Sequence, residues 1–495
     1  MASAFLLCAS CTKNFQQINQ SADFVSTPNI DFELPYVELT MIDNTYYTQG
    51  DYVAPLVGQV TQQKTYINRI TPGDETGGLH WKWIYQNPLK NVVDLMSRTK
   101  GDSTKVNYYN IGRIIKVYLA ATLTDTYGDM PYFQAAEGYT NQVFQPAFDA
   151  QQDIYADMFN ELQQAATALN VNQPVPTTSD IVYKGDVTKW RKFAYGMMLR
   201  LGLRIYKADP VNSAKWINAA IAGGLPASNA DNFVVNYLPA SSTGSASNPT
   251  VNGQPWIFIN YPTKYRLTKP FVDFLVTHND PRTPVYCMLP GNATKYAFGD
   301  TVSAHQKGYI MFGTDTAVTA TVNTFSTSNI LTFGRLDAPY MHLSYAQVQY
   351  QLAECVVRGI ISGDAKTYYQ NGVAAAMTEL SIYNTSLAIS TAAVNSYLAQ
   401  NPYAPASTED ALNIINTQYW IETHYNWYEG FANMRRSGYP KIYDQLDLTF
   451  PANQGATLPH RLTYPPSEVA ANPHAQDAIK RQGADICSTH VWWDK

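Results

Sequence analysis

Apolar and small side chains recur at a spacing of three and four residues over residues 340–377. The recurring positions of the first half are Met341, Tyr345, Val348, Leu352, Cys355 and Gly359. Such spacing places side chains on one face of an α-helix. We therefore predict a helix that ends between Gly359 and Gly363, followed by a second helix capped by Asp364. Together they would form a helix-turn-helix unit of the tetratricopeptide (TPR) type.

The second predicted helix carries small residues, Gly372 and Ala376, where two helices must approach closely. A single unit of this kind cannot bury its apolar face and needs stacked neighbours. Helical spacing recurs, with interruptions, over residues 31–96, and then over 106–136, 147–169, 190–206, 216–223 and 408–435. The pattern predicts an all-α scaffold of TPR-like helix pairs. Over residues 190–206, a basic edge that includes Arg200 and Arg204 predicts a solvated side.

Residues 237–339 differ from this pattern because Ser, Thr, Asn, Pro and Gly dominate, and clear helical spacing is confined to 269–278. A bare loop of this length is implausible inside a compact domain, so we predict a loop-rich, partly β subdomain. We predict a signal and tether at residues 1–30 and one body at 31–495. The body would comprise a scaffold at 31–236 and 340–436, the subdomain, and an extended C-terminal segment at 437–495.

The composition argues against nucleic acid as a partner. Charged residues make up 15% of the chain and the formal net charge is -5, so the basic field that nucleic-acid binding requires is missing. Aromatic residues reach 13%, with 36 Tyr. Tyr and Trp suit binding surfaces, although packing between helices is the alternative for any single ring.

The N-terminus MASAFLLCASC places Ala9 and Ser10 directly before Cys11, as lipoprotein signal processing requires. We predict that Cys11 is a lipid anchor. The apolar segment is shorter than that of an ordinary signal peptide and lacks basic residues before it. The alternatives are a redox or zinc pair formed by Cys8 and Cys11, or a chance pattern in a disordered terminus. No later apolar run approaches the length of a membrane-spanning helix.

Sequence motifs of catalysis and cofactor binding are absent: there is no phosphate loop, dinucleotide fingerprint, Gly-x-Ser-x-Gly elbow or His-Glu-x-x-His. The histidines, His460 among them, share no metal-ligand spacing with a neighbour, so we predict neither metal nor cofactor. Asp149 and Asp153 lie one helical turn apart, which is typical of a solvated first helical turn. A binding protein is favoured over a glycoside hydrolase, whose carboxylates meet only in space. A TPR adaptor without a small ligand is the third class.

Sugar rings pack on exposed aromatic rings, so candidate ligand contacts are rings in loops rather than on helical stripes. Those in or beside Pro-, Gly- and Asn-rich stretches are Trp81, Trp256, Tyr261, Tyr265 and Tyr296. For each of these five, packing of its loop is the alternative. The tryptophans at positions 83, 190, 216, 420 and 427 lie within predicted helices and are assigned to packing.

Several segments together resemble one known family. They include CTKNFQQIN, YLAATLTDTYGDMPYFQA, HNDPRTPVY, WYEGFANMRRSGYPK and RLTYPPSEVAANP, in this order along the chain. They are similar to the SusD/RagB-type surface lipoproteins of Bacteroidota. The resemblance implies an all-α TPR-like scaffold whose loop-rich face binds glycan or, in some members, peptide. It implies no catalysis.

The resemblance also implies a partner and a location. The partner would be a SusC-like TonB-dependent outer-membrane transporter, in a two-plus-two assembly, and the protein would be lipid-anchored at the cell surface. The matching residues Gly128, Asp129, Pro131, Arg435, Arg436 and Pro440 are expected to be structural. Ligand residues of the family lie in variable loops, so the matching motifs assign none here.

Overall fold

The computed structural model describes residues 29–43, 48–62, 75–138, 141–239, 248–261, 264–290, 299–311, 324–446 and 457–495. Its α-helices are α2 (Ile30–Thr40), α3 (Ala54–Val57), α4 (Leu79–Ile84), α5 (Lys90–Thr99), α6 (Val106–Tyr127), α7 (Gln151–Ala168), α8 (Val187–Arg204), α9 (Pro210–Gly223), α10 (Trp256–Asn260), α11 (Lys269–Thr277), α12 (Thr283–Tyr286), α13 (Tyr345–Val357), α14 (Ala365–Thr378), α15 (Thr391–Gln400), α16 (Thr408–Glu422), α17 (Trp427–Ser437), α18 (Pro466–Ala471) and α19 (Ala475–Gln482). The strands are short: β1 (Val60–Gln62), β2 (Phe233–Val235), β3 (Tyr265–Leu267), β4 (Cys287–Met288), β5 (Thr327–Ser328) and β6 (Tyr340–Leu343). The all-α prediction is confirmed.

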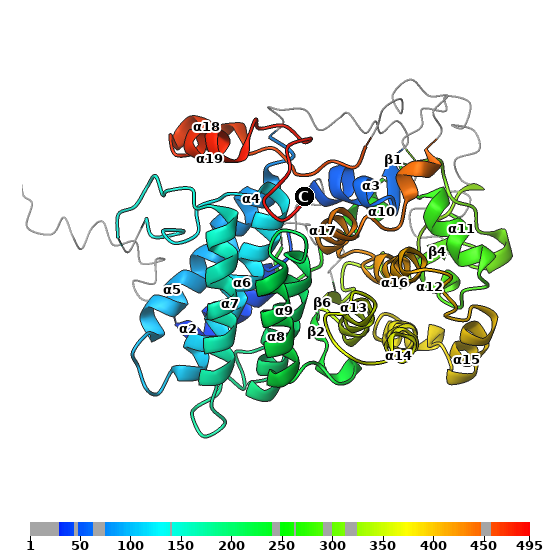
Figure 1. Ribbon diagram of the computed structural model, residues 1–495, viewed down its shortest axis with the longest axis horizontal. Helices are drawn as coiled ribbons and strands as arrows, with labels where there is room; N and C mark the ends of the chain where they lie inside the picture. Colours follow the sequence, from blue (N-terminus) through cyan, green and yellow to red (C-terminus); the bar gives the residue numbers. More distant parts are fainter. Residues whose placement is uncertain are drawn as a thin grey trace, which may run out of the picture.

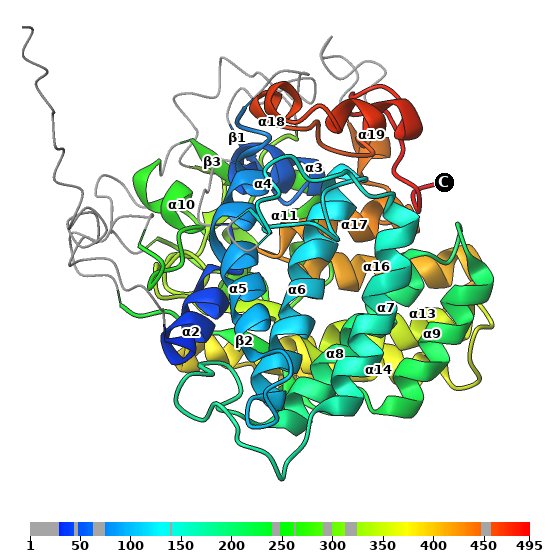
Figure 2. The ribbon, with the colours of Figure 1, turned by 90° about the vertical axis from the view of Figure 1, so that its left-hand side faces the viewer.

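Two sets of helices cross at a large angle. In Figure 1, α5 to α9 run up and down the page, whereas α13, α14, α16 and α17 are seen nearly end-on. Neighbouring helices of each set pack along the chain, α6 on α7, α7 on α8, α8 on α9 and α13 on α14. Figure 2 shows the first set from the side, with α18 and α19 at the top of the molecule. Within the described residues, no helix combines the length and the apolarity that a bilayer span requires.

The predicted helical hairpin at residues 340–377 is confirmed as α13 and α14, with one correction. The first helix begins only at Tyr345, because Ser344 accepts a hydrogen bond from the backbone N–H of Gln347 and caps it, while Met341 lies in β6. Asp364 caps α14 as predicted. A Cβ on Gly372 would lie 2.6 Å from a ring carbon of Tyr350, so the small residue permits the close crossing.

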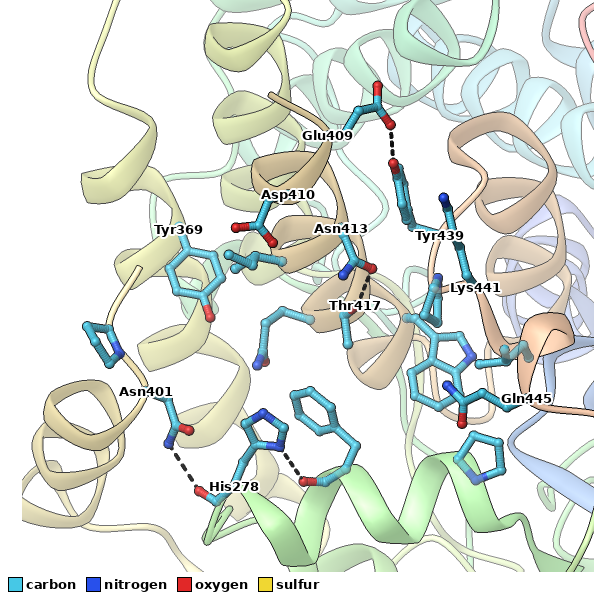
Figure 3. A pocket seen from close by; sticks show the side chains of 18 of the residues that line it. His278, Tyr369, Asn401, Glu409, Asp410, Asn413, Thr417, Tyr439, Lys441 and Gln445 are labelled. Carbon is cyan, nitrogen blue, oxygen red and sulfur yellow. Dashed lines mark hydrogen bonds between the residues drawn. The ribbon is translucent and has the colours of Figure 1, made fainter. Parts of the chain in front are cut away.

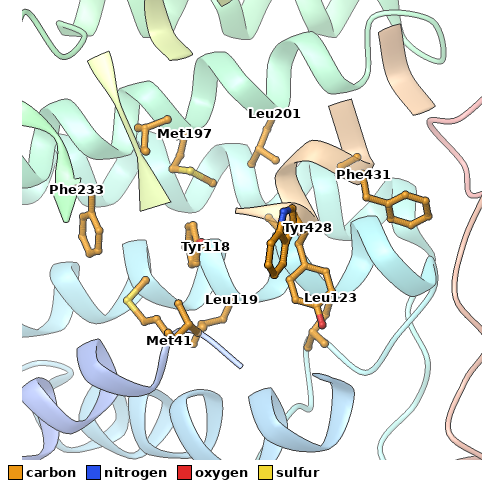
Figure 4. Packing of buried hydrophobic residues seen from close by; sticks show 14 of the residues in the cluster. Met41, Tyr118, Leu119, Leu123, Met197, Leu201, Phe233, Tyr428 and Phe431 are labelled. Carbon is orange, nitrogen blue, oxygen red and sulfur yellow. The ribbon is translucent and has the colours of Figure 1, made fainter. Parts of the chain in front are cut away.

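The hydrophobic core lies between the two sets of helices. Figure 4 shows side chains of α6, α8 and α17 meeting there, among them Leu123, Leu201 and Phe431, all at most 1% exposed. The antiparallel pair β2–β6 runs through this region and joins residues 233–235 to residues 340–343. The pair β1–β3 similarly brings residues 60–62 beside residues 265–267.

The solvated basic edge predicted on α8 is wrong at two positions. Arg204 is 1% exposed and donates a 2.6 Å hydrogen bond to Glu429 of α17; its Nε also lies 3.3 Å from Asp125 of α6. Arg200 is 4% exposed and donates to the carbonyl of His342 at 3.0 Å. Buried guanidinium groups require such partners, and the partners come from distant segments that helical spacing does not reveal.

The C-terminal segment from residue 437, predicted to be extended, contains the short helices α18 and α19. The helical stretch predicted over 408–435 is two helices, α16 and α17, separated by residues 423–426. Residues 237–339 hold loops, short helices and short strands in their described parts. The wider division into tether, scaffold and subdomain stays a prediction, and Cys11 lies outside the described residues.

Candidate ligand-binding surfaces

Two buried side chains hold helix α10 in place, while Trp256 at its start and Tyr261 directly after it remain partly exposed. Ile257 is fully buried, and a Cβ on Gly50 would lie 2.8 Å from it, so α10 packs directly on the backbone of the π-helical turn Thr48–Val53. Phe258 is 2% exposed. Trp256 is half-buried, and Tyr261, directly after the helix, is 38% exposed. These two rings therefore remain accessible at the surface.

Charged and polar groups are fixed beside these rings. The Lys264 ammonium lies 5.5 Å from the centre of the Tyr261 ring, 4.9 Å from that of Tyr265 and 3.8 Å from a carboxylate oxygen of Asp51. The same carboxylate accepts hydrogen bonds from the Gln62 amide and the Tyr265 hydroxyl. We call the partly exposed Trp256, Tyr261 and Lys264, together with the buried Asp51 and Tyr265, the α10 surface. It combines exposed ring area with a cation and a fixed carboxylate.

The α10 surface brings together three of the five rings that the sequence singles out, but in different states. Trp256 and Tyr261 expose ring area, as predicted. Tyr265 is fully buried, so the exposure predicted for it is wrong, because pairing of β3 with β1 places its side chain in the interior. Tyr296 lies outside the described residues.

Trp81 is also buried, at 3% exposure, which corrects its predicted place in an exposed loop. It lies in the first half of α4, where Phe148 stacks on it at 5.8 Å between ring centres and the rings of Tyr127 and Tyr464 meet it edge to face at 5.4 and 5.6 Å. It borders a pocket of about 310 Å³ between α4 and α18. Because aromatic neighbours cover the ring, Trp81 contributes to packing.

A larger pocket, of about 640 Å³, lies among helices α11, α14, α15 and α16 and the segment after α17 (Figure 3). We call it the α16 pocket. Its aromatic walls offer little ring face. Phe274 is stacked by His278 at 4.0 Å between ring centres, while Tyr369, Tyr397 and Tyr439 are at most 5% exposed.

Polar side chains of α16 line the same pocket. Asn413 and Thr417, one helical turn apart, point into it, and the threonine hydroxyl lies 3.4 Å from the side-chain amide oxygen Oδ1 of Asn413. Asp410 lies one turn earlier and accepts a 2.9 Å hydrogen bond from the Ala406 backbone N–H. Burial, followed by the hydrogen bond to Glu409, raises the pKa of the Tyr439 phenol to about 12, so the phenol is neutral at physiological pH.

Sequence reasoning missed the residues that accompany these rings. Lys264 and Asp51 are separated by more than two hundred positions and meet through the β1–β3 pair, so no local pattern announces them. The polar face of α16 was detectable, because Asp410, Asn413 and Thr417 recur at a spacing of three and four residues, which places them on one face of the helix.

The paired aspartates of the α7 region have a structural explanation. One carboxylate oxygen of Asp149 accepts 2.9 Å hydrogen bonds from the backbone N–H groups of Tyr132 and Phe133. Asp153 lies in the first turn of α7, where the helix dipole favours a negative charge. Asp149 therefore holds the backbone at residues 132–133, and Asp153 stabilises the N-terminal end of α7.

Comparisons with known proteins agree with this architecture. A SusD-like family model, described as starch-binding and associating with the outer membrane, matches residues 28–465. A solved chitin-binding protein is 29% identical over 94% of this chain and all of its own, with a TM-score of 0.81. A Bacteroidetes SusD-like structure, AC2a, is 25% identical over the same shares, with a TM-score of 0.83.

A chitin-binding SusD homologue from Flavobacterium johnsoniae, 21% identical, covers 94% of this chain and 98% of its own with a TM-score of 0.75, which shows the shared fold. No curated protein matches the chain. The family model spans most of the sequence, and the helical architecture is the one that these solved structures share. The chain therefore belongs to the SusD-like family of binding proteins that associate with the outer membrane.

Proposed function

We propose that the protein binds glycan on the α10 surface. The observation that supports this proposal most directly is the exposed ring of Tyr261, which lies beside the Lys264 ammonium and the fixed Asp51 carboxylate. A sugar ring has a flat C–H face that packs on an aromatic ring, and its hydroxyl groups require charged or amide partners at fixed positions. Trp256, the first residue of α10, supplies a second, partly exposed side chain.

Chitin oligosaccharides are the first ligands to test, because a protein 29% identical over its whole length is named as chitin-binding. Isothermal titration calorimetry of the full chain with chitin, starch and other oligosaccharides identifies the ligand. Tyr261→Ala is then expected to weaken binding by about 5- to 150-fold, if the ring contributes the ~1–3 kcal/mol that a nucleic-acid base gains by stacking on one aromatic ring. The melting temperature should stay unchanged because the ring is 38% exposed.

Phe32 provides a matched control, since its ring is 77% exposed and lies on α2, outside the α10 surface. Phe32→Ala should leave both affinity and melting temperature unchanged. Normal glycan affinity in a folded Tyr261→Ala, Trp256→Ala double variant would refute the assignment of the α10 surface. Turnover of the oligosaccharide by repurified protein would favour the hydrolase instead.

We further propose that the protein delivers its ligand to a SusC-like TonB-dependent transporter, from a lipid anchor at Cys11 on the cell surface. The family's association with the outer membrane supports this placement. Stable anchoring requires more than one acyl chain, as full lipoprotein processing supplies. Extraction of the tagged protein in mild detergent is expected to recover a large β-barrel, and Cys11→Ala should release the protein from the membrane fraction.

Recovery of the protein alone, from an extract that contains the barrel, would contradict the transporter partnership. Membrane retention of Cys11→Ala equal to that of the wild type would place the anchor elsewhere. The two results are independent, because the first concerns a protein interface and the second a covalent lipid.

Peptide binding is the second candidate function, and the α16 pocket favours it. Its rings present edges rather than free faces, whereas Asn413, Thr417 and Asp410 offer the amide, hydroxyl and carboxylate groups that pair with a peptide backbone. Asn413→Ala tests this function: if the ligand is a peptide in this pocket, the variant weakens binding while Tyr261→Ala does not. If the ligand is a glycan bound to the α10 surface, Tyr261→Ala weakens binding and Asn413→Ala does not.

A further inference from the structure

Two histidines and an aspartate that are distant in sequence meet at the C-terminal end of the chain. Nδ1 of His460 lies 2.8 Å from a carboxylate oxygen of Asp494, and Nδ1 of His490 donates to the Asp494 backbone carbonyl at 2.5 Å. The two imidazole rings stack with their centres 3.5 Å apart and an interplanar angle of 25°. One nitrogen or oxygen from each side chain lies within 4.8 Å of the others.

The backbone around this cluster is held by buried structure. The His460 N–H donates to the Cys487 carbonyl at 2.7 Å, which joins the segment before α18 to the segment after α19. Trp493, next to Asp494, is fully buried and donates from its indole N–H to Asp125 of α6 at 2.8 Å. Asp494 itself is 4% exposed. The three candidate ligands therefore lie on backbone segments that these contacts hold in place, and His490 is exposed to solvent.

We propose that His460, His490 and Asp494 bind a zinc ion that fastens residues 487–495 to residues 457–465. Two imidazole nitrogens and one carboxylate oxygen form a recognised zinc ligand set, with water in the fourth position. Zinc–nitrogen and zinc–oxygen bonds of about 2.0–2.2 Å place ligand atoms within the range of separations found here after small side-chain rotations.

The alternative is a metal-free His460–Asp494 ion pair with His490 stacked upon it. The two arrangements differ in a measurable way. A simple ion pair should bind zinc no more tightly than an isolated surface histidine does, whereas a zinc site binds one equivalent and raises the melting temperature, because a ligand that binds the folded state stabilises it. An exposed pair outside the cluster provides a matched control: Nδ1 of His474, the residue before α19, lies 3.2 Å from a carboxylate oxygen of Asp477 in its first turn.

The test uses the full chain, free of any histidine tag and treated with EDTA, titrated with zinc chloride by calorimetry and followed by thermal unfolding. We expect one equivalent to bind and the melting temperature to rise. His490→Ala, at an exposed position, should fold normally and weaken zinc binding by at least about tenfold, as the loss of a metal ligand or its supporting partner does. Asp494→Asn should do the same, and His474→Ala should bind zinc as the wild type does.

Absence of zinc binding by the wild-type chain would overturn the proposal, and so would equal affinities for the wild type and His490→Ala. A loss of affinity in His474→Ala as large as that in His490→Ala would show non-specific binding to surface histidines and refute the site. These outcomes are independent of glycan binding, because the three residues lie outside the α10 surface and the α16 pocket.

Discussion

Glu354 of α13 and Arg436 of α17 form a buried, two-pronged ion pair. The two guanidinium nitrogens donate to the two carboxylate oxygens at 2.6 and 2.7 Å, and the residues are 1% and 5% exposed. Arg358, one turn further along α13, donates to the same carboxylate at 2.7 Å. The motif RRSGYP, which lies in one of the segments that resemble the family, thus contributes a cross-link between helices, in agreement with the structural role expected of Arg436.

Removing the charge of Glu354 should destabilise the fold. In Glu354→Gln, Arg436 and Arg358 lose a charged partner in a buried site, for which we expect a loss of about 3 kcal/mol in the free energy of unfolding. Glu161→Gln is the control, because Glu161 pairs with Arg113 at 2.7 Å but is 22% exposed in its side chain. That variant should lose less than about 1 kcal/mol. Equal losses in urea-induced unfolding of the two variants would contradict the prediction.

The same carboxylate makes stability depend on acid pH. Burial alone would raise its pKa, but the attraction of Arg436 and Arg358 dominates and lowers the pKa of Glu354 from 4.5 to about 2. A lowered pKa in the folded state contributes stability that is complete above pH 4.5 and is lost as the pH falls toward 2. Glu354→Gln should therefore lose less stability than the wild type over this window. Parallel curves of unfolding free energy against pH would be the contrary result.

Glu379 should have the opposite dependence on pH. Burial, followed by repulsion from Glu422 and a hydrogen bond to it, raises the pKa of Glu379 well above 4.5. A carboxyl group that is protonated in the folded state stabilises at low pH, and this contribution is lost as the pH rises through the raised pKa. Glu379→Gln keeps the shape without the ionisation. Its advantage over the wild type in urea unfolding should grow as the pH rises above 4.5, and a constant difference would oppose this explanation.

Close packing of α13 on α14 predicts the result of a single added methyl group. In Gly372→Ala the new Cβ would lie 2.6 Å from the Tyr350 ring, which is fully buried. We expect a loss of about 1–3 kcal/mol through overpacking, despite the better helix propensity of Ala. Asn371→Ala, at the neighbouring exposed position, is the control and should unfold like the wild type. An increase in the melting temperature of Gly372→Ala would show that the helices separate without cost.

Trp81 and Tyr261 should respond oppositely to truncation. Trp81→Ala removes a ring that is 3% exposed and enclosed by other rings, so a loss of about 3–5 kcal/mol is expected. Its glycan affinity should equal that of the wild type under conditions where the variant is folded. If Trp81→Ala instead weakened glycan binding and left the melting temperature unchanged, Trp81 would be a ligand contact and not a packing residue.

The sequence by itself determined the helical scaffold and the family. Three-and-four spacing located the hairpin of α13 and α14, and the capping role of Asp364 and the small side chain at Gly372 followed from local chemistry. These features depend on neighbours within one or two helical turns, which a linear pattern records. Helix α6 likewise ends at a glycine, Gly128, whose φ of 87° is a conformation that glycine adopts readily.

The tertiary structure decided which side chains are available to a ligand or an ion. Trp81 and Tyr261 both stand beside loop-like sequence, yet aromatic neighbours from distant segments enclose the first and leave the second exposed. Arg204 can be buried because its guanidinium group forms ion pairs with the carboxylates of Glu429 and Asp125. His460 and Asp494 come together through the return of the chain after α19. Burial and pairing of this kind depend on contacts between residues far apart in sequence, and helical periodicity carries no information about such contacts.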